Sequence, residues 1–530
     1  GEDVGQLQGG AGEDGGGVDE RGGDALPLQP GRQQRFHLLN DISNKIDQNL
    51  VLLTATPHSG KQEEFQSLLG LLKKRFANID ISTSTEDQRK EIADHFIQRR
   101  RADIVIKSIG EETKFPDRNA SDNPYALTRE YIDLFNDILE YARGIVKGSA
   151  TNGRQRYGYW DALALLRGVM SSPAAGISML QNKAAKKKLT EDEDEFDTAS
   201  NESEAETVLD TDFSAEDNLP TSVIERSGSD NESKRLLAYA ARLQEIADAS
   251  LTKDNKVKET VAQVKDWLQN RRNPIIFCRY IPTANYLGQI CRQYFTGKAY
   301  KDLHIEVVTS ELNDDLRREK IASMQGDGKR RLLIATDCLS EGINLQDGFN
   351  ALLHYDLPWN PNRLEQREGR IDRFGQQADS VDITLLYGSN NPIDGVVLDV
   401  LLRKAREIRR SIGISIPFPE SSASVMEAVM NAVLLKPVPV VDVARQGSLF
   451  EAEEIQAEKN KVARAFEEAE KREKASRSIF AKNTIKVSEI EEDLKEVDEA
   501  IGDVKTVESF VVEAMRFMGI DVTADKDGYR

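Results

Sequence analysis

The stretch "RLLIATDCLSEGINLQDGFNALLHYDLPWNPNRLEQREGRIDRFGQ", residues 331–376, decides the fold. Two short apolar runs, "RLLIATD" and "ALLHYDLP", are typical of buried strands, and "NRLEQREGRIDRFG" has the pattern of a helix. The alternation continues outward, with strands at "PIIFCR", "HIEVVTS" and "VDITLLYG" and helices at "TANYLGQICRQYF" and "DLRREKIASMQ". Short apolar strands separated by helices predict βαβ units. We therefore expect an α/β domain with a parallel sheet over residues 251–410.

Length and composition are those of a chain with more than one folded core. The chain has 530 residues, of which 39% are hydrophobic, and this is enough for two or three domains. No apolar run is long enough to span a bilayer, and the acidic, glycine-rich start does not have the pattern of a secretory signal. Three scattered cysteines, Cys278, Cys291 and Cys338, favour a reducing compartment over a disulfide framework. The composition predicts a cytoplasmic protein.

The net charge of −19 is unevenly distributed along the chain. Residues 191–232, which include "EDEDEFDTASNESEAE", carry roughly −15, and the first thirty residues carry roughly −6. The remaining chain is therefore near neutral. A core that binds nucleic acid stays possible despite the acidic total.

An arginine-rich segment follows the strand at residues 351–358. Asn360 suits a helix N-cap and Pro361 suits the first helical turn. Arg367, Arg370 and Arg373 then recur at every third residue, which predicts a cationic stripe at the carboxyl end of a parallel sheet, where ligands of open α/β folds bind. The stripe has two interpretations: a solvated face, or planar guanidinium groups placed for the charge on a transferring phosphoryl group.

A second polar segment follows the strand at residues 331–336. The strand ends in Thr336 and Asp337, and Ser340, Glu341 and Gly342 come next. Hydroxyl and backbone N–H groups at such a strand end can hold a nucleic-acid phosphate, and Gly342 permits a close turn.

The segment "LTATPHSGK", residues 53–61, has the ending of a phosphate-binding loop but lacks its essential parts. A P-loop needs two glycines bracketing four residues, followed by Lys-Ser or Lys-Thr. Ala55 stands where the first glycine would be, and Gln62 follows Lys61. We interpret Ser59-Gly60-Lys61 as the start of the next helix.

Four segments together resemble a known family. "NPNRLEQREGRIDRFGQ" resembles motif VI of superfamily-two helicases, in the form found in Snf-type (RapA-like) ATP-dependent DNA translocases. "RLLIATDCLSEGINLQ" resembles their motif V, "PIIFCRYIPTANYL" their motif IV and "LLTATP" their motif III. The family order of the four motifs argues against chance similarity. Three segments are similar in sequence to the large helicase of the DISARM phage-defence system. They are "LLTATPHSGKQEEFQSLLGLL", "YWDALALLRGVMSSPAAG" and "DLPWNPNRLEQREGRIDRFGQ".

The resemblance implies roles for particular residues. It implies arginine fingers at Arg370 and Arg373, with Gln366 beside the nucleotide. It implies nucleotide contacts from Glu341, Gly342 and Asn344. It implies nucleic-acid contacts from Thr336, Ser340 and Arg279. Thr54 and Thr56 have the implied role of coupling nucleotide state to the grip on nucleic acid. The implied cofactors are ATP and Mg²⁺, although no residue of this chain is assigned as a metal ligand. The resemblance implies two kinds of partner, duplex DNA and other proteins.

The sequence departs from the family at the phosphate side of the ATP site. It contains no Gly-x-x-x-x-Gly-Lys-Ser/Thr and no Asp-Glu-x-His before Leu53, and the family needs both to hold nucleotide and magnesium. We therefore expect an N-terminally truncated translocase, inactive in ATP hydrolysis by itself. The alternatives are a RecA-like module that binds DNA or a partner without hydrolysis, and an independent P-loop kinase that uses Lys61.

The expected organisation has six parts. They are an anomalous disordered leader (1–32), the end of a first RecA-like domain with motif III (33–120), a helical insertion (121–182), an acidic disordered linker (183–250), a second RecA-like helicase C-terminal domain (251–410), and a helical extension (411–530). The terminal "ADKDGYR" predicts a strand pair broken off by a C-terminal truncation.

Overall fold

The computed structural model describes residues 38–45, 50–53, 62–79, 84–95, 115–151, 155–185, 230–324, 328–339, 343–359, 361–391, 394, 464, 504–520, 522–525 and 528–529. Contacts divide the chain into two units, residues 1–53 and 54–530. The described part of the first unit contains one short helix, residues 38–43. The predicted leader 1–32 and residues 191–229 of the acidic run 191–232 lie outside the described residues, whereas residues 230–232 begin a helix.

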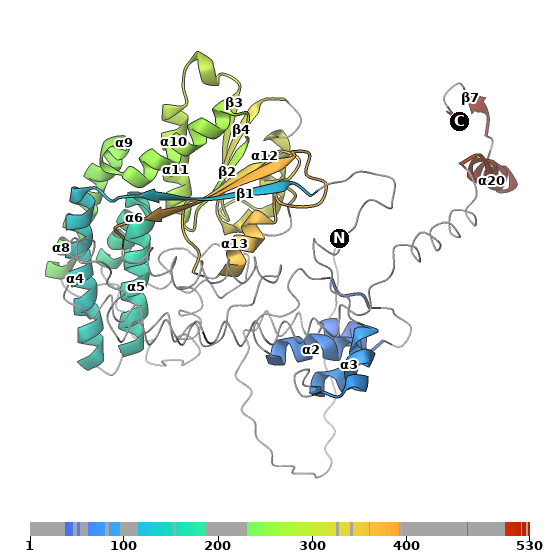
Figure 1. Ribbon diagram of the computed structural model, residues 1–530, viewed down its shortest axis with the longest axis horizontal. Helices are drawn as coiled ribbons and strands as arrows, with labels where there is room; N and C mark the ends of the chain where they lie inside the picture. The colour runs from blue at the N-terminus through green and yellow to red at the C-terminus, as the bar shows by residue number, and fades with distance from the viewer. Residues whose placement is uncertain are drawn as a thin grey trace, which may run out of the picture. The chain divides into compact units, whose positions relative to one another are not determined.

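A six-stranded sheet forms the centre of the second unit (Figure 1). Its order is β1-β6-β5-β2-β4-β3, and every neighbouring pair is parallel. This confirms the predicted α/β class, a RecA-like parallel sheet with flanking helices. The strands are β1 (Asp117–Tyr125), β2 (Pro274–Phe277), β3 (Leu303–Val308), β4 (Arg330–Ala335), β5 (Ala351–His354) and β6 (Ser380–Gly388).

Helices surround this sheet in the order that the sequence pattern predicts. Asp254 caps α10 by accepting from the backbone N–H of Val257, and a proline stands in the first turn of α11. In Figure 1, α4 and α5 lie side by side next to the sheet. The helices are α4 (Arg129–Thr151), α5 (Gln155–Ser171), α6 (Pro173–Ala184), α8 (Asp230–Asp248), α9 (Ser250–Lys253), α10 (Asn255–Gln269), α11 (Ile281–Tyr294), α12 (Asp314–Met324) and α13 (Pro361–Glu368), with short 3₁₀ turns η4 (Lys298–Tyr300) and η5 (Asp337–Leu339).

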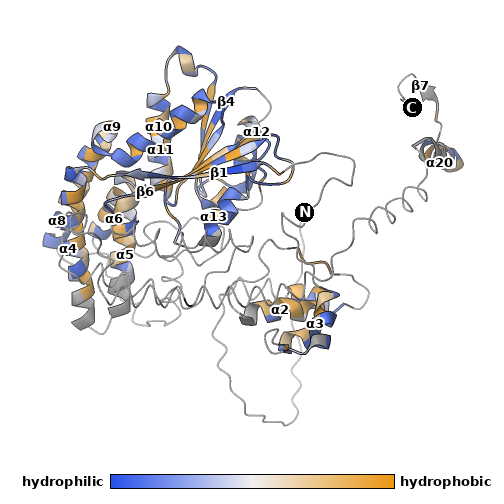
Figure 2. Ribbon diagram, viewed as in Figure 1, coloured by the Kyte–Doolittle hydropathy of each residue, from blue (hydrophilic) through white to orange (hydrophobic). Residues whose placement is uncertain are grey.

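Alternating side chains give the sheet two apolar faces, because successive residues of a strand point to opposite sides. In β4, Leu332 and Ile334 belong to one core cluster and Leu333 and Ala335 to the other. The first cluster, here called the large face, includes side chains of α4, α5, α6, α8, α10 and α11; the second, the small face, includes side chains of α12 and η5. Figure 2 shows the apolar strands between helices that are polar on their outer sides.

Two expected boundaries were wrong. Strand β1 lies outside the predicted 251–410 domain, yet all nine of its residues pair with β6. Its sequence "DRNASDNPY" is polar because most of its side chains are exposed, so it did not have the pattern of a strand. Helix α8 occupies Asp230–Asp248, where we expected the linker to continue to residue 250, and Leu236 and Leu243 on it are fully buried.

Two smaller groups of elements are described by themselves. The first contains α2 (Gln62–Leu72), η1 (Lys74–Asn78) and α3 (Glu86–Ala93), whose buried Phe65, Phe76 and Ile92 form a small cluster. The second contains α20 (Val504–Phe517) and an antiparallel pair, β7 (Ala524–Asp525) and β8 (Gly528–Tyr529). This pair confirms the strands predicted in "ADKDGYR". Among the helices described, none has the length and apolar character needed to cross a membrane.

Candidate functional site

Polar side chains gather where β2, β4 and β5 end. Arg279 follows β2, Asp337 follows β4 and Asp356 follows β5, each two residues beyond the last strand residue. Because the three strands are parallel neighbours, these positions share the carboxyl edge of the sheet. Ligands of open α/β sheets bind at this edge.

Arg367 of α13 joins two of these strand ends. Its Nε and Nη2 donate to Asp337 Oδ1 and Oδ2 at 2.6 and 2.8 Å, and its Nη1 donates to the backbone oxygen of Asp356 at 3.2 Å. Arg363 lies one helical turn earlier, with Nη1 3.7 Å from Asp337 Oδ2. Burial alone would raise the pKa of Asp337, but the Arg367 and Arg363 guanidinium groups hold that pKa well below its usual range. Asp337 is therefore a charged anchor for two arginines.

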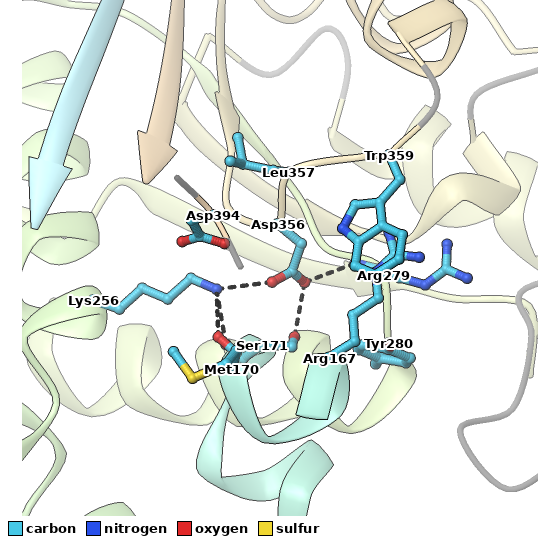
Figure 3. Close-up of a pocket in the computed structure, with 10 residues that line it drawn as sticks. All are labelled: Arg167, Met170, Ser171, Lys256, Arg279, Tyr280, Asp356, Leu357, Trp359 and Asp394. Carbon is cyan, nitrogen blue, oxygen red and sulfur yellow. Dashed lines mark hydrogen bonds and ion pairs between the residues drawn. The ribbon is translucent and has the colours of Figure 1, made fainter. Parts of the chain in front are cut away.

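Asp356 anchors a second network, drawn in Figure 3. Lys256 Nζ donates to Asp356 Oδ1 at 2.8 Å and to the backbone oxygens of Ser171 and Met170 at 3.0 and 3.2 Å. Asp356 Oδ2 accepts from Ser171 Oγ and from the backbone N–H of Arg279, both at 2.9 Å. Although burial raises the pKa of Asp356, Lys256 and these donors hold it below its usual range. The network joins α5, α10 and two strand ends.

A small pocket opens beside this network (Figure 3). Its cavity volume is about 20 Å³, which is room for a water molecule and not for a nucleotide. Arg167 stacks on Trp359, with its guanidinium carbon 4.4 Å from the ring centroid. The residues that line the pocket are Arg167, Met170, Ser171, Lys256, Arg279, Tyr280, Asp356, Leu357, Trp359 and Asp394.

Two arginines of this pocket carry charges that burial disfavours. Burial lowers the pKa of Arg167 to about 10, and burial together with the neighbouring Arg167 lowers the pKa of Arg279 to about 9. Two guanidinium groups that repel each other favour an anion between or beside them. Burial and charge repulsion therefore both act against positive charge at this edge of the sheet.

The predicted cationic stripe is not one helical face. Helix α13 ends at Glu368, so only Arg367 of the three arginines is helical, and it is 1% exposed and paired with Asp337. Gly369 follows the last helical residue, and a Cβ at this position would lie 3.0 Å from the backbone oxygen of Glu365, so the tight backbone there favours glycine. Arg370 and Arg373 lie in the following turn, which leads back to the start of β6. We call residues 369–376 the arginine turn.

The arginine turn brings two predicted site residues together. Arg373 Nη1 donates to Asn344 Oδ1 at 2.6 Å, and both residues are exposed. Gln346 Nε2 donates to the backbone oxygen of Phe374 at 3.1 Å, which holds the same turn against the loop after β4. Gln366 lies in α13 and is half-buried, as is Arg370. A predicted finger and a predicted nucleotide contact therefore share one surface.

Thr336 is not placed as we expected. Its side chain is fully buried, and its hydroxyl lies 3.4 Å from Cys338 Sγ. Burial prevents this hydroxyl from contacting a nucleic-acid phosphate as the structure stands. Arg279 is half-buried at the edge of the sheet. The remaining predicted residues, Thr54, Thr56, Ser340, Glu341 and Gly342, lie outside the described residues.

Cys278, Cys291 and Cys338 are buried in the core. Burial raises the pKa of the Cys278 thiol well above its usual range and that of Cys291 to about 12. Buried thiols of this kind are chemically inert. Their role is packing.

Magnesium, which the family resemblance implies, has no fitting donor set in the described part of the chain. No group of three or more His, Cys, Asp or Glu side chains is placed there to hold a metal ion. The two carboxylates at the strand ends, Asp337 and Asp356, are bound by arginine and lysine. Both carboxylates are therefore already engaged by cationic side chains in the described part of the chain.

Sequence reasoning missed Arg167, Lys256, Trp359 and the partners of Asp337 and Asp356. Arg167 and Asp161 are the charged residues of the otherwise apolar stretch "YWDALALLRGVM", and a charge on a buried helix is costly without a partner. This was a usable signal. Lys256 has no comparable signal, because its partner Asp356 is 100 residues away.

Comparison with known proteins identifies the class of the central domain. Residues 253–375 match the family model described as the helicase conserved C-terminal domain. The chain is 44% identical over 86 residues to the uncharacterized ATP-dependent helicase YqhH of Bacillus subtilis (strain 168), covering 16% of this chain and 15% of that protein. It is 42% identical over 90 residues to the RNA polymerase-associated protein RapA of Vibrio vulnificus (strain YJ016), covering 17% and 9%.

A solved structure with some likeness is the Sulfolobus solfataricus SWI2/SNF2 ATPase core in complex with dsDNA. It shares 16% sequence identity, with 77% of this chain and 68% of that chain covered, at a TM-score of 0.36. The matches to YqhH and RapA extend over less than a fifth of either relative. The family model matches residues 253–375 alone, and the activity of a whole protein is a separate question.

Proposed function

We propose that this chain is the C-terminal part of an ATP-dependent Snf-type DNA translocase, which couples ATP hydrolysis to movement on duplex DNA. The observation that carries the proposal is the placement of Arg373 against Asn344 at the end of a helicase C-terminal domain. In this domain the arginine turn provides exposed positive charge beside an amide. Charge of this kind stabilises a transferring phosphoryl group when a nucleotide is presented to it.

The roles within the turn follow from its contacts. Arg373 is oriented by Asn344, so its guanidinium has a defined direction before any ligand binds. Arg370 is the second proposed finger, and Gln366 on α13 is the proposed neighbour of the nucleotide. ATP with Mg²⁺, when bound, supplies the phosphoryl group and the divalent charge. Glu341 and Gly342 are the remaining proposed nucleotide contacts.

The strand-end cluster is the proposed DNA-facing part of the site. Arg279 is half-buried beside the buried Arg167, whose charge disfavours its own, and a backbone phosphate would stabilise the Arg279 guanidinium. Contacts to phosphates position a protein on DNA without reading its sequence, as a translocase requires. Ser340 is proposed as an additional phosphate contact, and Thr54 and Thr56 are proposed to couple nucleotide state to DNA grip.

The cellular role is proposed on the likeness to the DISARM helicase. It is ATP-driven DNA movement during bacterial phage defence, with other defence proteins as partners. The buried, inert cysteines fit a reducing cytoplasm.

The test is ATP hydrolysis by the chain with and without duplex DNA, then with an upstream RecA-like half from a related ATPase added. We expect no turnover by the chain alone and DNA-stimulated turnover after addition of that half. Absence of turnover in every combination, together with retained DNA binding, would favour a non-hydrolysing binding module. Turnover by the chain alone that Lys61→Ala abolishes would show an independent P-loop enzyme and would overturn the proposal.

A further inference from the structure

The arginine turn is held from one side by a residue outside the helicase C-terminal match. Arg118 belongs to β1, and its side chain forms an ion pair with Glu368 and lies 4.0 Å from Asp372, measured from Nη1 to Oδ2. Glu368 and Asp372 stand two residues before and two residues after Arg370. One guanidinium therefore spans the part of the chain that carries a proposed finger.

The geometry of the sheet explains why Arg118 reaches this turn. Arg118 is in register with Val381 of β6, so both side chains point to the small face. His354, the last residue of β5, reaches the same carboxylate, with Nε2 3.2 Å from Glu368 Oε1. Glu368 is therefore held between β1 and β5 while its side chain is only 2% exposed.

Glu368 also starts the turn through its backbone. Its carbonyl oxygen accepts from the N–H groups of Ile371 and Asp372 at 3.1 and 2.8 Å. A shift of Glu368 would therefore move the backbone that follows it. A buried carboxylate that loses its charged partner is costly to keep in place, so loss of Arg118 would release the start of the turn.

We propose that Arg118 is a positioning residue for the arginine turn, clamping Glu368 and Asp372 so that Arg370 and Arg373 face the nucleotide in a fixed direction. The inference deepens the proposed ATPase function and rests on it for the nucleotide. Arg118 itself lies on the neighbouring strand and acts only through the two carboxylates. Lysine can restore the charge but not the fork geometry that spans two carboxylates.

A matched control is available on the opposite face of the same sheet. Arg272 Nε lies 2.9 Å from Asp382 Oδ2, with side-chain exposures of 21% and 22%. Arg118 is 22% exposed, so the two arginines are comparable in accessibility. Val381 and Ile383 point to the small face, so Asp382, which stands between them in β6, points to the large face. The ion pair of Arg272 with Asp382 therefore lies on the large face.

The first readout is amide hydrogen exchange of residues 369–376 in the whole chain, with Arg118→Ala, Arg118→Lys and Arg272→Ala compared. We expect Arg118→Ala to speed exchange of this peptide about tenfold, Arg118→Lys to recover part of the protection, and Arg272→Ala to leave it unchanged. Unchanged exchange in Arg118→Ala would overturn the proposal. Equal acceleration by Arg272→Ala would also overturn it, because the effect would then be general loosening.

The second readout is DNA-stimulated ATP turnover with the added upstream half. We expect Arg118→Ala to lower kcat about tenfold to a hundredfold with little change in KM for ATP, because misplacement of fingers affects the transition state more than binding. If the wild-type chain shows no turnover but Arg118→Ala still loosens the turn, the proposed ATPase function fails and the clamp stands. Normal kcat in an active Arg118→Ala protein would overturn the positioning role.

Discussion

Replacing Arg367 by methionine tests whether the buried Arg367–Asp337 pair holds the strand ends together. Methionine keeps much of the arginine stem but removes both bonds to Asp337 and the bond to the Asp356 carbonyl. Asp337, 8% exposed, would then be a buried carboxylate without its main partner. Breaking such a pair from one side costs about 3–5 kcal/mol. Arg363 remains 3.7 Å away and offsets part of this cost, so we expect a loss of about 3 kcal/mol in the free energy of unfolding.

Urea unfolding followed by tryptophan fluorescence measures this loss in the right part of the chain. The chain has three tryptophans, and Trp160, Trp267 and Trp359 are all buried in the large-face cluster. The signal therefore reports unfolding of the central domain, and an unchanged m-value allows the midpoint shift to be read as a free energy.

A surface pair and a double variant give the controls for Arg367→Met. Arg330 pairs with Asp302 at side-chain exposures of 25% and 53%, so Arg330→Ala should cost at most about 1 kcal/mol. Adding Asp337→Asn to Arg367→Met should restore more than half of the lost stability, because the buried charge is removed. A loss in Arg367→Met no greater than that in Arg330→Ala would refute the reasoning.

Three further outcomes are expected. Arg373→Ala and Asn344→Ala should each lower ATP turnover of the reconstituted enzyme by more than about tenfold. The double variant should be little worse than Arg373→Ala, because the two side chains act as one unit. Additive losses in the double-mutant cycle would contradict this coupling. Arg279→Met should reduce the slope of log binding constant against log salt for duplex DNA by about one, and an unchanged slope would remove Arg279 from the proposed DNA contacts. Burial raises the pKa of Asp254 to about 6, so the folded state binds the proton more tightly and this group's contribution to the free energy of unfolding falls as pH rises from about 4 to 6. In Asp254→Asn, the free energy of unfolding measured by tryptophan fluorescence should therefore decline less steeply over this pH range. An identical pH profile would refute the assignment.

The sequence predicts the buried strands well because their apolar character does not depend on distant contacts. β2, β4 and β5 have four or more consecutive buried residues, and the pattern alone located them. β1 could not be found this way, because its pairing with β6 is made through the backbone while its side chains stay polar. Helix α8 was obscured by the acidic residues that precede it. Its buried face is defined by partners on α6.

The sequence pattern did not predict the geometry of the candidate site. A repeat of three placed Arg367, Arg370 and Arg373 on one surface, and this requires an unbroken helix. The helix ends before Gly369, so Arg367 turns inward to Asp337 while Arg373 reaches Asn344. The contact of Arg373 with Asn344 joins segments that are 29 residues apart, and spacing within either segment carries no information about it.

Arg367 and Asp356 connect the two proposed parts of the site at one edge of the sheet, the arginine turn and Arg279. Arg367 binds the Asp337 carboxylate after β4 and the Asp356 carbonyl after β5. The Asp356 carboxylate in turn accepts from the backbone N–H of Arg279 after β2. A displacement of α13 relative to Arg279 would therefore have to break buried, charge-assisted hydrogen bonds, which are the strong ones. A chain of buried hydrogen bonds thus connects α13, from which the arginine turn continues, to Arg279, and we expect the proposed finger and the proposed DNA contact to move together.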